Sequence, residues 1–96
     1  MTPAEMEDNV KHASTLLKAM SNEKRLMILC YLGQEEMSVG ALEKLVGLSQ
    51  SALSQHLARL RRDGFVQTRR EAQTIYYSLK GEETEIVIGA LKQLYC

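Results

Sequence analysis

Two cysteines, Cys30 and Cys96, have the clearest potential for covalent chemistry in this 96-residue sequence. In a reducing cytoplasm, such a pair is less suited to a permanent disulfide than to a redox or ligand-binding site. Cys30 taken alone is better explained as a small buried apolar residue, because free cysteine is often buried. The sequence shows no nucleophile–base arrangement, phosphate-binding loop or cluster of metal-ligand residues, so we expect no enzyme and no resident cofactor.

Hydrogen-bonding side chains follow one face of a helix expected at 49–62. Ser49 is suited to cap this helix, and Leu48 and Leu53 occupy the positions of a hydrophobic staple. Leucines at helical spacing form its buried stripe. The opposite face carries serine, glutamine and arginine, which can bind base edges and phosphates. We therefore expect DNA contacts from Gln50, Ser51, Ser54, Gln55, His56, Arg59 and Arg62.

An ordinary solvated surface helix would also present a polar face. The cap, the staple, the preceding turn and the following hairpin together favour DNA binding over that interpretation. His56 lies at the edge of the apolar stripe. We interpret it as a packing or phosphate-contacting residue rather than a metal ligand, because no partner ligand is near it in sequence.

The elements around this helix form a helix-turn-helix followed by a wing. A short helix ends at Gly47, and Gly64 ends the DNA-contacting helix. Strands are expected at 65–70 and 74–79, with alternating apolar residues in the second strand. Arg69 and Arg70, near the tip of the hairpin, are suited to lie along the DNA backbone.

Three further helices and a loop are expected before and after this motif. The first helix covers about 4–19, the second begins after Ser21 or Asn22 and ends near Gly33, and 34–37 is a loop. The third helix is capped by Ser38, and the last helix covers 82–95. The sequence thus predicts one mainly helical domain over residues 1–96, with a β-hairpin wing between its fourth and fifth helices.

The two terminal helices are expected to form a homodimer interface. They are strongly apolar on one side, and a domain of this size has little core with which to cover them. A dimer also suits two DNA half-sites that lie one helical turn apart. The expected interface residues are Leu16, Leu17, Ile86, Ala90 and Leu94.

The net charge is zero, but the charge is unevenly distributed. Residues 47–80 contain six Lys or Arg and two Asp or Glu, a sum of +4, while the segments on either side each sum to −2. Attraction to phosphate is local on this scale, since the Debye length is roughly 8 Å at physiological salt. The acidic N-terminus does not resemble a signal peptide, and no apolar run is long enough to span a membrane. We therefore expect a cytoplasmic protein without a membrane partner.

The segment LVGLSQSALSQHLARLRRDGFV and the wing RREAQTIYYSL resemble the arsenic-repressor (ArsR) family of bacterial winged-helix repressors. The resemblance extends over about residues 10–96. It implies a homodimer that binds operator DNA and leaves it when an inducer binds.

Two metal-sensing patterns of that family are absent from the sequence. The helix at 39–46 has no cysteine, and the helix at 82–95 has no aspartate or histidine. The placement of Cys30 and Cys96 is instead similar to the persulfide-sensing branch typified by BigR, SqrR and HlyU. The resemblance implies that reactive sulfur species bridge the two thiols through a disulfide or polysulfide, and that DNA is then released.

Other functions stay open at the level of sequence. A general oxidant sensor could use a plain disulfide between the same thiols, and a metal sensor could combine the thiols with other donors. The domain could also be a winged helix that binds protein, although its basic segment favours DNA.

Overall fold

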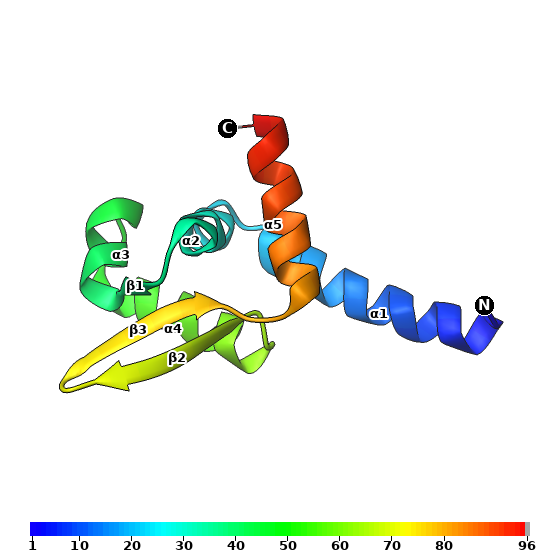
Figure 1. Cartoon of the computed structure of the whole chain (residues 1–96), viewed down its shortest axis with the longest axis horizontal. Coiled ribbons are helices and arrows are strands. Elements are labelled where there is room, and N and C mark those ends of the chain that lie inside the picture. Colours follow the sequence, from blue (N-terminus) through cyan, green and yellow to red (C-terminus); the bar gives the residue numbers. More distant parts are fainter. Residues whose placement is uncertain (96) are drawn as a thin grey trace.

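Five helices and a three-stranded antiparallel sheet make up residues 1–95, the part of the chain that the computed structural model describes (Figure 1). The helices α1 to α4 precede the hairpin, and α5 follows it, as the sequence predicts. The elements are α1 (Pro3–Met20), α2 (Glu23–Gln34), β1 (Met37–Ser38), α3 (Val39–Val46), α4 (Gln50–Arg62), β2 (Val66–Glu71), β3 (Thr74–Leu79) and α5 (Glu82–Tyr95).

The helix boundaries follow from local capping chemistry. The hydroxyl of Ser38 accepts the Ala41 N–H at 3.2 Å, and the hydroxyl of Ser49 accepts the Ala52 N–H at 3.2 Å. Both serines therefore satisfy a backbone donor that has no partner within its helix. At the end of α3, Gly47 has a φ of 73°, a conformation that costs glycine no steric strain.

The strand β1 departs from the prediction, since the sequence predicts a loop at 34–37. Met37 pairs with Tyr77 and Ser38 with Tyr76, so the strand order in the sheet is β1-β3-β2. A strand of two residues is too short to show an alternating pattern in sequence. It exists because β3 offers it a pairing partner. Tyr77, which pairs with Met37, lies 40 residues later in the chain.

Leucine and isoleucine side chains from α2, α3 and α4 form the centre of the core. Burying each of them contributes about 1.5–3 kcal/mol to folding. The leucine stripe expected on α4 is buried, so its opposite face is left to solvent. The residues at 0% or 1% exposure in these three helices are Ile28, Leu29, Leu42, Leu53, Leu57 and Leu60.

Two basic residues in the first turn of α2 hold the neighbouring helices. Arg25 is 8% exposed and donates to the carbonyls of Ala19 at 2.9 Å and Lys18 at 3.1 Å, near the end of α1. Lys24 Nζ donates to the carbonyl of Val46, the last residue of α3, at 3.0 Å. Cations are disfavoured at a helix N-terminus by the dipole, but here both of them satisfy the C-terminal carbonyls of other helices.

The helices α2 and α5 approach each other closely at Gly33. A Cβ atom at this position would lie 2.8 Å from Ile88 Cγ2, which is closer than side chains tolerate. Ile88 is 2% exposed and therefore has little room to move. The glycine thus sets the distance between the two helices.

We expect Gly33→Ala to lower the free energy of unfolding and Gly89→Ala to raise it. Alanine stabilises a helix by about 1 kcal/mol relative to glycine. At Gly33, however, overpacking destabilises the fold by about 1–3 kcal/mol, which opposes this stabilisation. At Gly89 no atom lies within 4 Å of the added Cβ, so the variant is a matched control. Urea titrations followed by circular dichroism measure both changes. Equal stabilisation by the two alanines would contradict the close approach.

Candidate DNA interface and thiol site

The exposed face of α4 carries most of the residues that the sequence predicts as DNA contacts. Six of them are exposed, and Ala58 lies exposed among them. The buried leucines fix the orientation of this face, and the bond from Lys24 to Val46 fixes the turn that precedes it. The six exposed predicted residues of the helix are Gln50, Ser51, Ser54, Gln55, Arg59 and Arg62.

The arginines at the end of α4 differ in their surroundings. Arg59 Nε lies 3.9 Å from Asp63 Oδ2, a loose ion pair at the solvent-exposed end of the helix. Arg61 and Arg62 line an open pocket of about 460 Å³ between α4 and the sheet, together with Tyr77 of β3. These two cations therefore border the space between the helix and the wing.

His56 is half-buried beside the core. Burial lowers the pKa of its imidazole, and the nearby positive charges of Arg25 and Arg59 lower it further. The ring is therefore mostly neutral at pH 7, since its ordinary pKa is already about 6.5. Of the two roles expected from the sequence, this environment favours packing over a charged contact with phosphate.

The two wing arginines occupy different environments. Arg69 Nε donates to both oxygens of the Glu36 carboxylate at 2.8 Å, and its Nη1 donates to Glu71 Oε2 at 2.9 Å. These hydrogen bonds, to Glu36 first, raise the pKa of Arg69. Arg70 is exposed and has no ion pair within residues 1–95. Sequence reasoning missed Glu36, since it lies 33 positions before Arg69.

The predicted thiol site is only partly described. Cys30 lies on α2, where it is half-buried and packs against the core. Cys96 lies outside the described residues. The helix that leads to it, α5, packs against α2 near Gly33, three positions beyond Cys30. Within residues 1–95, no cluster of three or more histidine, cysteine, aspartate or glutamate residues could hold a metal ion.

The terminal helices expose several large apolar side chains. Leu17 is 59% exposed on α1, while Ile86 and Leu94 are 63% and 74% exposed on α5. Ala90 is also exposed. Leu16 differs from this expected set because it is 7% exposed and belongs to the core of the protomer. Its place on the inner side of α1 leaves it little surface to offer a partner.

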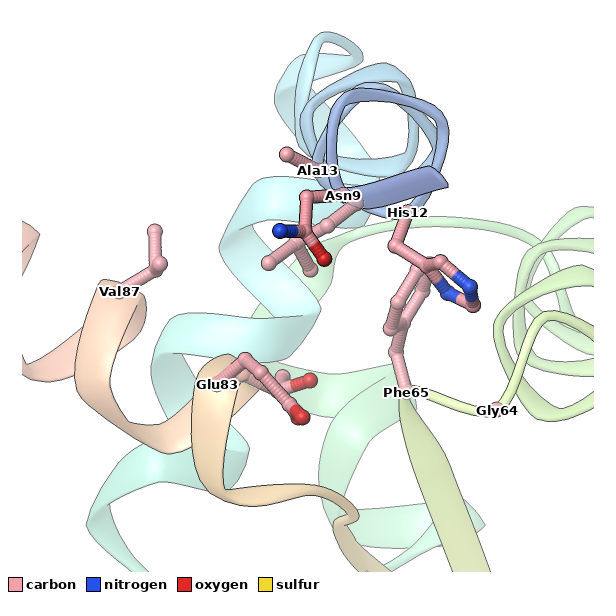
Figure 2. A pocket seen from close by; sticks show the side chains of 9 residues that line it. Asn9, His12, Ala13, Gly64, Phe65, Glu83 and Val87 are labelled. Atoms are coloured by element: carbon pink, nitrogen blue, oxygen red, sulfur yellow. The ribbon is translucent and has the colours of Figure 1, made fainter. Parts of the chain in front are cut away.

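A pocket of about 480 Å³ separates α1 from α5 near the turn between α4 and β2. Figure 2 shows Asn9 and His12 of α1 at one side, Glu83 and Val87 of α5 at another, and Phe65 at the turn. The first half of α1 extends away from the body of the domain (Figure 1), and residues 1–13 are all exposed. Within the described chain, little covers the outer side of the terminal helices.

Residues 22–68, which contain the helix-turn-helix, match the family model for the bacterial regulatory protein, arsR family. Over its full length, the chain is 57% identical to the transcriptional activator HlyU of Vibrio cholerae and covers 89% of that protein. The chain belongs to the ArsR family. It is accordingly a DNA-binding transcriptional regulator rather than an enzyme.

Solved structures of relatives have the same winged-helix fold. Reduced HlyU from Vibrio cholerae has a TM-score of 0.92 and 59% identity, and the match covers 96% of this chain and 97% of that one. The transcriptional repressor BigR from Xylella fastidiosa has a TM-score of 0.86 and 40% identity, with 100% and 98% covered. Residues 1–95 contain no helix with the length and apolar character needed to cross a membrane.

Proposed function

We propose that this ArsR-family regulator is a homodimeric repressor that reactive sulfur species release from its operator by bridging Cys30 and Cys96. The observation that carries the proposal is the tight packing of α2, which bears Cys30, against α5, which leads to Cys96. A covalent link between these helices acts on a contact that already sets their separation. The structure of one relative, HlyU from Vibrio cholerae, is that of its reduced form.

The chemistry requires two thiols and a persulfide. A cysteine thiolate attacks the sulfane sulfur of glutathione persulfide, which forms a protein persulfide and expels glutathione thiolate. The second cysteine then attacks the inner sulfur of that persulfide, forming a disulfide and releasing hydrosulfide. If both cysteines first become persulfides, their reaction gives a trisulfide and releases hydrogen sulfide. The longer bridge suits thiols that lie beyond the separation an ordinary disulfide permits.

The path from this bridge to DNA follows the contacts of α2. Its first turn holds the end of α1 through Arg25 and the end of α3 through Lys24. A change in the angle between α2 and α5 therefore moves α1 and the helix-turn-helix together with α2, relative to α5. In a dimer, this movement alters the spacing of the two α4 helices, and a coupling of about 1–3 kcal/mol is typical of such switches.

The exposed apolar surface of the terminal helices supports a homodimer. Leu17, Ile86, Ala90 and Leu94 lie exposed on the two helices that the chain itself covers least. One structural relative, the DNA-binding domain of Mb0332 from Mycobacterium bovis, is described as homodimeric and has a TM-score of 0.83. We propose that the same two helices of this chain bury their apolar side chains against a second copy.

The proposal is tested with the reduced wild-type protein bound to operator DNA. Glutathione persulfide should release the DNA in a gel-shift titration, and intact-mass spectrometry of the same samples should show the bridge. A disulfide removes two hydrogen atoms, and each additional bridging sulfur adds its own mass. Hydrogen peroxide and zinc serve as comparisons. Release by peroxide alone would support a general oxidant sensor, and release by zinc alone would support a metal sensor.

The proposed DNA contacts of α4 lead to a separate prediction. We expect Arg62→Ala to flatten the plot of log affinity against log salt by about 0.9 for any DNA sequence, because one phosphate contact is lost. We expect Gln55→Ala to leave that slope nearly unchanged and to reduce discrimination between operator and random DNA. Fluorescence anisotropy at several salt concentrations measures both effects. If neither variant alters binding, α4 is not the reading helix.

A further inference from the structure

Arg69 and Arg70 are adjacent on β2 and project from opposite faces of the wing, because successive side chains in a strand alternate. Arg69 lies opposite Tyr76, and Arg70 lies opposite Ile75. The face of Arg70 continues into Val66, which is 1% exposed, and is therefore the face that packs on the helices. Arg69 projects from the outer face.

The face that carries Arg70 is also the side on which α4 lies. Tyr77 belongs to this face, two positions after Ile75 on β3. Its side chain lines the same pocket as Ser54 and Ala58, two residues of the exposed face of α4. A DNA backbone lying against α4 therefore meets the side of the wing from which Arg70 projects.

The guanidinium of Arg69 is held on three sides. Its Nε and Nη2 form a forked pair with the carboxylate of Glu36, at 2.8 and 2.7 Å. Its Nη1 donates to Glu71 Oε2 at 2.9 Å. The guanidinium carbon lies 4.5 Å from the ring centroid of Tyr76, a cation–π arrangement. Forked pairs of this kind fix the geometry of a side chain as well as its charge.

The charge of this cluster is unfavourable for binding phosphate. One arginine faces two carboxylates, so the group has a net charge of −1 at neutral pH. Glu36 lies in the segment between α2 and β1, whereas Arg69 and Glu71 lie on β2. The cluster therefore joins the hairpin to the segment before β1, across the outer face of the three-stranded sheet.

We infer that Arg69 is a positioning residue, which holds the wing at a fixed angle through Glu36, and that Arg70 alone supplies the phosphate contact at the wing. The inference rests on the proposed binding of operator DNA and gives the two adjacent arginines different functions within it. Exposed ion pairs of this kind contribute modestly. We therefore expect a fall in affinity of about twofold to fivefold when the cluster is broken.

Salt dependence separates the two functions. Arg70→Ala should flatten the salt slope by about 0.9, because a phosphate contact disappears. Arg69→Ala should weaken binding at every salt concentration with an unchanged slope. Arg69→Lys should weaken binding as much as Arg69→Ala, because lysine keeps the charge but cannot form the fork. Wild-type affinity in Arg69→Lys, or a flattened slope in Arg69→Ala, would overturn the inference.

Variants of Glu36, the ion-pair partner of Arg69, test the positioning role more directly. Glu36→Gln should weaken DNA binding, although it removes a negative charge near the DNA. Glu35→Gln is the matched control, because Glu35 is the exposed neighbour and has no ion pair within residues 1–95. Combining Glu36→Gln with Arg69→Ala should weaken binding no further than Arg69→Ala alone, since both variants break the same contact.

An increase in DNA affinity, rather than a decrease, would identify a different role for Glu36. If Glu36→Gln binds DNA more tightly than Glu35→Gln, then Glu36 competes with phosphate for Arg69 and the inference is wrong. Thermal melts show whether the variants are folded, and the conservative Glu36→Gln keeps the experiment informative if Arg69→Ala does not fold. A wild-type protein that fails to bind operator DNA would contradict the proposed function itself, which is a separate outcome.

Discussion

Replacing either Cys30 or Cys96 by serine is expected to abolish release from the operator by glutathione persulfide while leaving DNA binding intact. A serine hydroxyl does not attack sulfane sulfur under these conditions, and a single persulfide cannot bridge α2 to the end of α5. Because serine is close to cysteine in size, the reduced dimer should keep its shape. The gel-shift titration should then show normal operator affinity and no release at persulfide concentrations that fully release the wild type.

The double variant and two metal reagents complete this experiment. The variant with both serines should behave like each single variant, because one missing thiol already prevents the bridge. Zinc and arsenite should have little effect on the wild type, because the sequence has no cysteine in α3 and no aspartate or histidine in α5, the residues of two metal-sensing patterns of the family. Release of either single variant at the wild-type persulfide concentration would show that the two-thiol mechanism is wrong.

Leu94→Glu is expected to dissociate the dimer and to lower operator affinity with it. Leu94 is 74% exposed in the protomer, so the substitution should not disturb the fold of the chain. In the proposed interface, the new carboxylate is buried without a partner, which costs several kcal/mol or forces it to take up a proton. Sedimentation velocity at micromolar concentration should show a monomer, and gel shifts should show weaker operator binding.

Lys92→Glu provides a matched control for added negative charge. It also makes the end of α5 more negative, but it lies about 160° around the helix from Leu94, at roughly 100° per residue. It is therefore expected to leave the dimer intact. A wild-type protein that sediments as a monomer at micromolar concentration would contradict the proposed interface, and so would a dimer that survives Leu94→Glu.

Local sequence patterns predicted the elements whose signals lie within a few residues. Ser38 and Ser49 cap α3 and α4 as expected, because a capping hydroxyl acts on a backbone N–H only three positions away. The leucine stripe of α4 and the wing were visible for the same reason, since helix and strand periodicity are local. The presence of a helix-turn-helix with a wing could therefore be derived from the sequence alone.

The tertiary structure decided the features that depend on distant partners. The strand β1 forms only because β3 is placed beside it, and Arg69 is held by Glu36, 33 positions earlier. Leu16 and Leu17 are adjacent in sequence, yet one is 7% exposed and the other 59%. Which side of a helix faces the core depends on what packs against it. A sequence identifies side chains able to bind DNA, but only the fold determines which of them already have partners within the chain.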